Sequence, residues 1–308
     1  MRIAIMGAGG VGGYFGGRLA LAGNDVTFIA RGAHGEAIRR NGLRAEGTLG
    51  EFHLQPAKCV ASAAEITGPV DVILFTVKLS DIEAAAEQLR PIVGPATTLY
   101  TVQNGVEAAE NVGNILGGEK VVPGVAYISA TIAEPGLIRS GTPFAGLAFG
   151  ETDRRESART KAFYDACKAA KFDATLAPDI TRTLWSKFAM LAPMAATTTL
   201  MRCGMGAIRA NPRSRALLQA LVEEIVAVGK AAGVHMEDGD VAAAMKVFDG
   251  LPPTVRASMA HDLDIGKPLE LPWLSGAVVR LGETHGVATP THRFITQALA
   301  PYEKGQPE

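Results

Sequence analysis

Short apolar runs alternate with segments of helical periodicity along the first half of the chain. The runs are rich in β-branched residues and have the length of buried parallel strands. They lie at residues 2–6, 26–30, 71–77 and 96–102. Helical patterns separate them, one continuing to about Ala22 and one covering residues 81–89. Strands and helices that alternate at this spacing predict βαβ units around a parallel sheet.

The pattern changes twice further along the chain. Between residues 121 and 150, Gly, Pro and Thr interrupt short apolar runs, which predicts antiparallel strands that extend the sheet. A helix at about 153–170 and a short strand ending near Ala177 follow, and nearly every later segment has helical periodicity. We therefore expect an α/β protein with a sheet domain over residues 1–177 and an all-helical domain over residues 178–308.

Charge and composition exclude several classes of function. The 30 Lys and Arg residues are balanced by 31 Asp and Glu residues, so the chain has no positive excess for binding nucleic acid. Its longest apolar stretch, residues 188–201, contains Pro193 and is shorter than the ~20 residues of a membrane span. The three cysteines are far apart and predict reduced thiols in a cytoplasmic protein. The six histidines lack metal-ligand spacing, so we expect no metal site.

A glycine-rich turn follows the first predicted strand directly. It has the pattern G-x-G-x-x-G and consists of Gly7, Ala8, Gly9, Gly10, Val11 and Gly12. In a Rossmann-type fold the first glycine permits a tight turn, the second lets the backbone approach a pyrophosphate, and the third allows close helix–sheet packing. The pattern alone also fits a surface turn, but its place between a strand and a helix favours a dinucleotide site.

The end of the second predicted strand indicates which dinucleotide binds. NAD-binding folds usually place Asp or Glu there to accept hydrogen bonds from the ribose 2′-hydroxyl. This strand ends in Ala30, Arg31 and Gly32, and the nearby Asp25 precedes it. A guanidinium can pair with a 2′-phosphate, so Arg31 favours NADP(H). The alternative is that Arg31 is a surface residue at the start of the next helix.

Six segments, in order, resemble the ketopantoate reductase (2-dehydropantoate 2-reductase) family. They are the opening G-A-G-G-V-G at residue 7, Lys78 after the strand L-F-T-V, Q-N-G at residues 103–105, W-S-K-F at 185–188, S-M-x-x-D at 258–262 leading to L-E at 269–270, and G-V-A-T-P at 286–290. The resemblance covers nearly the whole chain. It implies a Rossmann-type domain followed by a helical domain like that of 6-phosphogluconate dehydrogenase, a homodimer, and a place in pantothenate biosynthesis.

The resemblance also implies a role for each matching residue. Lys187 would donate a proton to the ketone oxygen as hydride arrives from NADPH, and Glu270 would bind substrate or hold Lys187. Asn104 and Lys78 would bind cofactor and substrate, and Ser258 would contact the carboxylate of a 2-oxo acid. A positioned acid suits this chemistry because hydride transfer to a ketone develops alkoxide charge, and burial lowers a lysine pKa toward neutrality. Apart from the resemblance, Lys187 reads as a snorkelling lysine and Glu270 as a helix N-terminal acid.

The chain departs from the family where substrate is expected to bind. Leu191 and Ala195 stand where the family usually has asparagines, Val255 replaces another, and Leu269-Glu270-Leu271-Pro272 replaces T-E-I-D. Because Lys187, Leu191 and Ala195 are spaced four residues apart, they share one helix face. We therefore expect a less polar pocket, and a 2-oxo acid that is either ketopantoate or a less polar relative.

Two other functions remain open from sequence. A related two-domain hydroxy-acid or opine dehydrogenase would keep the fold and change the reaction. A non-enzymatic NADP(H)-binding sensor would keep the cofactor site, but it would have no need of a proton donor such as Lys187.

Overall fold

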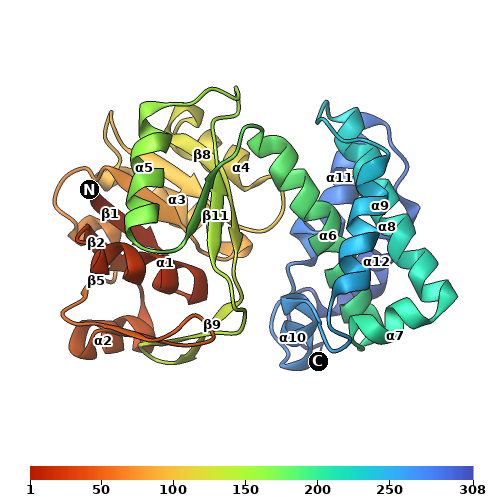
Figure 1. Ribbon diagram of the computed structural model, residues 1–308, viewed down its shortest axis with the longest axis horizontal. Coiled ribbons are helices and arrows are strands. Elements are labelled where there is room, and N and C mark those ends of the chain that lie inside the picture. Colours follow the sequence, from red (N-terminus) through yellow and green to blue (C-terminus); the bar gives the residue numbers. More distant parts are fainter. Residues whose placement is uncertain (308) are drawn as a thin grey trace. The chain divides into compact units, whose positions relative to one another are not determined.

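The computed structural model describes residues 1–307, and over this range the chain divides into two compact units. The first, here called the sheet unit, contains residues 1–103 and 107–180. The second, the helical unit, contains residues 104–106 and the chain from Thr181 onward. The boundary after Ile180 lies at the start of helix α6 (Ile180–Met201). Figure 1 shows both units and labels many of their elements.

Within the described residues, the main sheet of the sheet unit has eight strands in the order β12-β11-β8-β7-β6-β1-β2-β5. All neighbouring pairs are parallel except β8 with β11. Starting from β1, the sheet continues through β2 and β5 on one side and through β6, β7 and β8 on the other, as in a dinucleotide-binding fold. The strand bounds are β1 (Arg2–Met6), β2 (Asp25–Ile29), β5 (Lys58–Val60), β6 (Val72–Phe75), β7 (Thr98–Thr101), β8 (Val121–Tyr127), β11 (Gly146–Phe149) and β12 (Asp173–Leu176). The expected α/β class and parallel sheet are confirmed.

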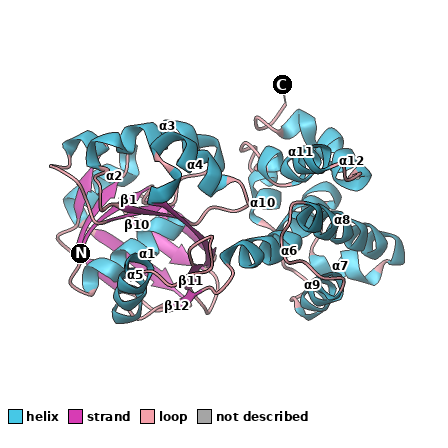
Figure 2. Cartoon of the chain, turned by 90° about the horizontal axis from the view of Figure 1, so that it is seen from above, coloured by secondary structure: helices cyan, strands magenta, loops and turns pink. Residues whose placement is uncertain are grey.

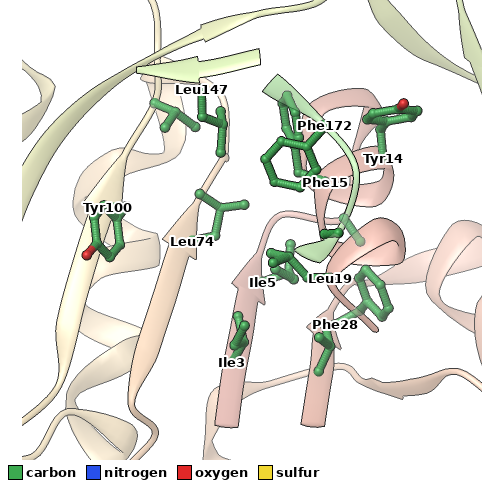
Figure 3. Packing of buried hydrophobic residues seen from close by; sticks show 14 of the residues in the cluster. Ile3, Ile5, Tyr14, Phe15, Leu19, Phe28, Leu74, Tyr100, Leu147 and Phe172 are labelled. Carbon is green, nitrogen blue, oxygen red and sulfur yellow. The ribbon is translucent and has the colours of Figure 1, made fainter. Parts of the chain in front are cut away.

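Helices cover both faces of this sheet. Figure 2 shows α3 (Ile82–Leu89) and α4 (Ala108–Leu116) on one face, with α1 (Gly10–Leu21) and α5 (Ala158–Ala169) on the other. Strand residues such as Ile5 and Leu74 are fully buried because the central strands have no solvent-exposed face. Figure 3 shows them packed with Phe15 and Leu19 of α1.

One expectation about the sheet is wrong in part. Strands β8 and β11 extend the main sheet as an antiparallel pair, but β9 (Ala130–Glu134) and β10 (Leu137–Ser140) do not join it. They form a separate sheet with β3 (Leu43–Gly47) and β4 (Phe52–Leu54), which has four strands among the described residues, in the order β4-β3-β10-β9. Strand β10 pairs in parallel with β3, about 90 residues earlier in the chain. A local pattern carries no information on so distant a partner.

Helix α1 lies between the two sheets, and glycines on opposite sides of it allow this. A Cβ at Gly16 would lie 2.7 Å from Ile5 and Phe28 of the main sheet. A Cβ at Gly17 would lie 2.5 Å from the Phe52 ring in the second sheet. Side chains at either position would separate a helix from a sheet, so the glycine-rich sequence of α1 serves packing as well as the turn before it.

The helical unit is built on one apolar core. Its elements are α6, α7 (Met205–Ala210), α8 (Pro212–Ala231), α9 (Gly239–Gly250), α10 (Ser258–Asp264), α11 (Ser275–His285) and α12 (Pro290–Leu299). The core contains Phe188 of α6, Leu221 of α8 and Val278 of α11. Among the described helices, including the 22-residue α6, none is long and apolar enough to cross a membrane.

Candidate active site

The glycine-rich turn lies at the carboxyl end of β1, beside the end of β6. Gly7 has a φ of +96°, which a residue with a side chain rarely adopts. The Thr76 hydroxyl, just after β6, donates to the Gly7 carbonyl at 2.6 Å and so holds the turn in place. In a sheet of this order, ligands bind outside the carboxyl ends of the strands at the point where the order reverses. The turn lies at that point, between β1 and β6.

The local geometry of the turn fits a dinucleotide. No side chain caps the N-terminus of α1 and no acidic residue lies in its first turn, so its amide groups suit an anion. A Cβ at Gly9 would meet no atom within 4 Å, whereas a Cβ at Gly12 would lie 2.2 Å from the Gly7 carbonyl oxygen. Gly9 therefore borders open space, and Gly12 lies at the contact of helix and sheet.

Two expected cofactor residues lie at the same end of the sheet unit. Arg31 is exposed and is the N-cap residue of α2 (Gly32–Asn41), directly after β2. Lys78 is also exposed and follows β6, in extended backbone at the start of a short 3₁₀ helix (Leu79–Asp81). Both lie in segments that leave the carboxyl ends of parallel strands, where dinucleotides bind in this fold.

In the helical unit, three of the expected site residues form a hydrogen-bonded chain. The Lys187 ammonium donates to the Asn104 side-chain oxygen at 3.1 Å. The Asn104 amide nitrogen in turn donates to a Glu270 carboxylate oxygen at 3.3 Å. The ammonium requires an acceptor and the carboxylate requires a donor, so these two bonds determine which way the amide of Asn104 points. Lys187 comes from α6, and Glu270 precedes the 3₁₀ helix Leu271–Trp273.

The surroundings of Lys187 change its ionisation. The residue retains some solvent exposure, but its ammonium is enclosed by protein atoms, and this burial lowers its pKa to about 8. The negative charge of Glu270 acts in the opposite direction and raises the pKa. A lysine with a pKa near 8 is a proton donor at neutral pH that gives up its proton more readily than an exposed lysine.

The turn that carries Asn104 is fixed at both sides. The side-chain amide nitrogen (Nε2) of Gln103 donates to the Phe75 carbonyl at 2.9 Å and to the Val77 carbonyl at 3.4 Å. Gly105 has a φ of +83°, and a Cβ there would lie 3.2 Å from the Trp273 carbonyl oxygen. Each residue of Q-N-G therefore has a structural role. Gln103 anchors the turn, Asn104 supplies the bridging amide, and Gly105 permits a positive φ close to another segment.

The other expected substrate residues differ in exposure. Leu191 is half-buried at the edge of the helical unit's core, whereas Ala195 is 1% exposed and packed within that core. Ser258 is exposed at the first residue of α10. Within residues 1–307, no group of three or more His, Cys, Asp or Glu side chains is arranged to hold a metal ion.

Sequence reasoning missed Thr76, Gln103 and His34 as residues that hold these turns. Their partners are backbone groups that lie between 26 and 102 residues away. Gln103 and Thr76 lie within the motifs Q-N-G and L-F-T-V, which is the one signal that could have indicated them.

Comparison with known proteins gives one consistent result. The family model "Ketopantoate reductase PanE/ApbA" matches residues 3–154, and that of its C-terminal part matches residues 179–303. A 2-dehydropantoate 2-reductase of Mesorhizobium japonicum is 31% identical, over 94% of this chain and 94% of that protein. An uncharacterised oxidoreductase of Bacillus subtilis, YkpB, is 27% identical, over 98% of this chain and 99% of that protein.

A solved structure agrees in both fold and sequence. The PanE/ApbA-family ketopantoate reductase of Ralstonia eutropha JMP134 superimposes with a TM-score of 0.90 at 29% identity, covering 98% of each chain. Together with the two family matches, this likeness covers both the sheet unit and the helical unit. The chain belongs to the ketopantoate reductase family, whose members are oxidoreductases acting on CH–OH groups.

Proposed function

We propose that the protein reduces a 2-oxo acid to the corresponding 2-hydroxy acid with NADPH. The observation that carries the proposal is the chain of Lys187, Asn104 and Glu270, which holds a lysine of lowered pKa in a fixed position. A dinucleotide-binding module without catalytic activity has no need of such a group. Relatives named 2-dehydropantoate 2-reductase support the same chemistry.

The glycine-rich turn and Arg31 would hold a nicotinamide dinucleotide, which would supply the hydride that the ketone carbon requires. The Lys187 ammonium donates a proton to the ketone oxygen, which would otherwise carry the negative charge of an alkoxide. Carbon gains the hydride, oxygen gains the proton, and Lys187 is left neutral until it takes a proton from solvent. Asn104 orients the ammonium, and Glu270 holds Asn104 and favours the charged form of Lys187.

NADP(H) is the proposed cofactor because of the charge at the end of β2. Arg31 is exposed there and can pair with a 2′-phosphate, and no carboxylate follows the strand to accept a hydrogen bond from a 2′-hydroxyl. The glycine turn serves either cofactor, so it supports binding of a nicotinamide dinucleotide without distinguishing the two.

The proposed substrate is a 2-oxo acid with a larger and less hydroxylated side chain than ketopantoate. Leu191 follows Lys187 by four residues on α6, is half-buried, and offers only apolar contacts. A substrate hydroxyl placed against it would lose water without gaining a partner, at a cost of about 1–3 kcal/mol. Ala195, four residues further along, is packed in the core and adds no polar group there. The expected homodimer remains a prediction, which size-exclusion chromatography tests.

The deciding experiment measures NADPH oxidation by the wild-type protein with a panel of 2-oxo acids that includes ketopantoate. We expect turnover with at least one of them, and a loss of about 10²–10⁴ in kcat in Lys187→Ala with NADPH binding retained. Lys246→Ala is the matched control, because Lys246 is an exposed lysine of the same helical unit. Cofactor binding without turnover of any acid would instead support a sensor. Oxidation of hydroxy acids or condensation with amino acids, without reduction of 2-oxo acids, would indicate a related dehydrogenase.

A further inference from the structure

His34 lies beside the glycine-rich turn and bonds to it. Its Nε2 is 2.8 Å from the carbonyl oxygen of Ala8, the residue between Gly7 and Gly9. Its Nδ1 accepts a hydrogen bond of 3.0 Å from the amide of Gly136, in the turn between β9 and β10. The imidazole therefore joins the dinucleotide turn to the second sheet.

The start of α2 fixes the position of His34. The helix begins at Gly32, whose φ is +62°, directly after β2. One turn later, a Cβ at Gly35 would lie 2.2 Å from the Ala30 carbonyl oxygen, so the helix packs tightly against the end of the strand. A side chain in this first turn is held at a defined place relative to β1 and β2, which are neighbouring strands.

The two partners of the imidazole determine its protonation state. A backbone amide can only donate and a backbone carbonyl can only accept, so Nδ1 must carry a lone pair and Nε2 must carry the hydrogen. The ring is therefore the neutral Nε2–H tautomer. Burial, which lowers the pKa of His34, favours the same neutral form.

Fixing the Ala8 carbonyl also fixes the amide that follows it. In a trans peptide the C=O and the next N–H point in opposite directions, so an Ala8 carbonyl held toward His34 turns the Gly9 N–H away from it. In the described part of the chain that N–H donates no hydrogen bond to protein, and a Cβ added to the same residue would meet no atom within 4 Å. An amide with this orientation is what an incoming pyrophosphate requires.

We propose that His34 is a positioning residue for the dinucleotide: its Nε2–H holds the Ala8 carbonyl so that the Gly9 amide faces the cofactor phosphates. This inference rests on the proposed function, because it assumes that the turn binds NADPH. It assigns the two ring nitrogens different roles. The bond to Ala8 serves the cofactor, and the bond to Gly136 holds the ring.

Two substitutions separate these roles. Glutamine can place an amide N–H near the position of Nε2, whereas asparagine can place an oxygen near the position of Nδ1. We expect the Kd for NADPH, measured by fluorescence titration, to rise roughly five- to tenfold in His34→Ala and His34→Asn and to stay within about twofold in His34→Gln. The kcat at saturating NADPH should change by less than about twofold in all three variants, since the chemical step is untouched.

His53→Ala is the matched control. His53 also bonds through Nε2 to a carbonyl of α2, that of Asn41 at 2.8 Å, but at the opposite end of the helix from the turn. We expect it to bind NADPH like the wild type. Wild-type affinity in His34→Ala, or equal losses in His34→Gln and His34→Asn, would overturn the inference alone. Failure of the wild type to bind either NADPH or NADH would overturn both it and the proposed function.

Discussion

At Lys187, two influences on one ammonium group determine how the site responds to pH. Enclosure by protein atoms disfavours the charged form, and the carboxylate of Glu270 favours it. The balance is a pKa of about 8, lowered from 10.5. The protonated form is the proton donor for ketone reduction, and the neutral form is the base for the reverse oxidation. The two directions should therefore have opposite pH dependence.

We predict that kcat for reduction falls as pH rises through about 8, and that kcat for oxidation of the hydroxy acid rises over the same range. In Glu270→Gln the negative charge that raises the pKa of Lys187 is lost, while an oxygen remains to accept from Asn104. The fall in kcat for reduction and the rise in kcat for oxidation should therefore both occur at lower pH. Profiles of kcat against pH in both directions measure this. If the pH profiles of kcat were the same in the wild type and in Glu270→Gln, a group other than Lys187 would be the one that titrates.

The resemblance implies that Glu270 could hold Lys187, but the sequence does not show that the link between them runs through the side chain of Asn104. Lys187 and Glu270 were assigned from motifs, and the structure brings them together through a third residue. The resemblance implies that Asn104 binds cofactor and substrate, which stays a prediction, and its side-chain amide also joins the lysine to the carboxylate. Which way an amide points depends on partners that lie 83 and 166 residues away, and no local spacing records them.

At the scale of elements, α1 has two roles, because its first turn borders the proposed dinucleotide site and its sides contact two sheets. Neighbouring glycines of the turn meet different demands. Gly9 borders open space, whereas a Cβ at Gly10 would lie 1.9 Å from the Ala130 carbonyl oxygen of β9. Gly9 therefore leaves room for the proposed ligand, whereas Gly10 allows α1 to pack closely against β9.

We predict that Gly9→Ala and Gly10→Ala fail in different ways. Gly9→Ala should change stability by less than about 1 kcal/mol and raise the Kd for NADPH by roughly tenfold or more, because the methyl group occupies the approach of the phosphates. Gly10→Ala should lower Tm, since overpacking against backbone costs about 1–3 kcal/mol, or roughly 2–12 °C for a unit of this size. Thermal melts without ligand and NADPH titrations separate the two. Equal Tm values would contradict the contact with β9.

A second prediction concerns the start of α2. If Arg31 pairs with a 2′-phosphate, Arg31→Ala should weaken NADPH binding roughly tenfold to a hundredfold and leave NADH binding nearly unchanged. Arg40→Ala is the control, because Arg40 is exposed on the same helix and pairs with Glu36. Titrations with both cofactors measure the effect. A wild type with equal affinity for NADH and NADPH would remove the basis for assigning NADP(H).

The main sheet could be predicted and the second sheet could not, for a physical reason. Central strands are buried on both faces, so β1 and β6 read as continuous apolar runs. In β9, by contrast, no residue is fully buried, and β4 has three residues. Such strands are stabilised by pairing across long sequence separations, and their composition resembles that of loops.

At the scale of the whole molecule, the proposed substrate preference rests on the apolar residues that follow Lys187 on α6. Leu191 retains exposure, whereas Ala195 is enclosed in the core. The two departures from the family pattern are therefore not equivalent. A change at Leu191 can alter the contacts made to a ligand, whereas Ala195 belongs to the core that stabilises the helical unit.

We predict that Leu191→Asn shifts the ratio of kcat/KM values toward ketopantoate, relative to 2-oxo acids with larger apolar side chains, by roughly tenfold, about the value of one hydrogen bond. Ala195→Asn should mainly lower stability, since an amide buried without partners costs about 1–3 kcal/mol. Steady-state kinetics on both substrates and thermal melts test the pair. A wild type that already prefers ketopantoate would mean that other groups supply the lost contacts.

The chain passes between the two units at residues 103/104, 106/107 and 180/181, and this has a consequence for recombination. The family matches fall in two segments, residues 3–154 and 179–303, and a recombination point between them would exchange one segment as a block. An exchange of the second segment would carry Lys187 and Glu270 together and leave behind the amide that joins them. In such a chimaera the link would depend on the residue that the other parent carries at the position of Asn104, and a parent without an asparagine there would lose the link without losing either charged residue.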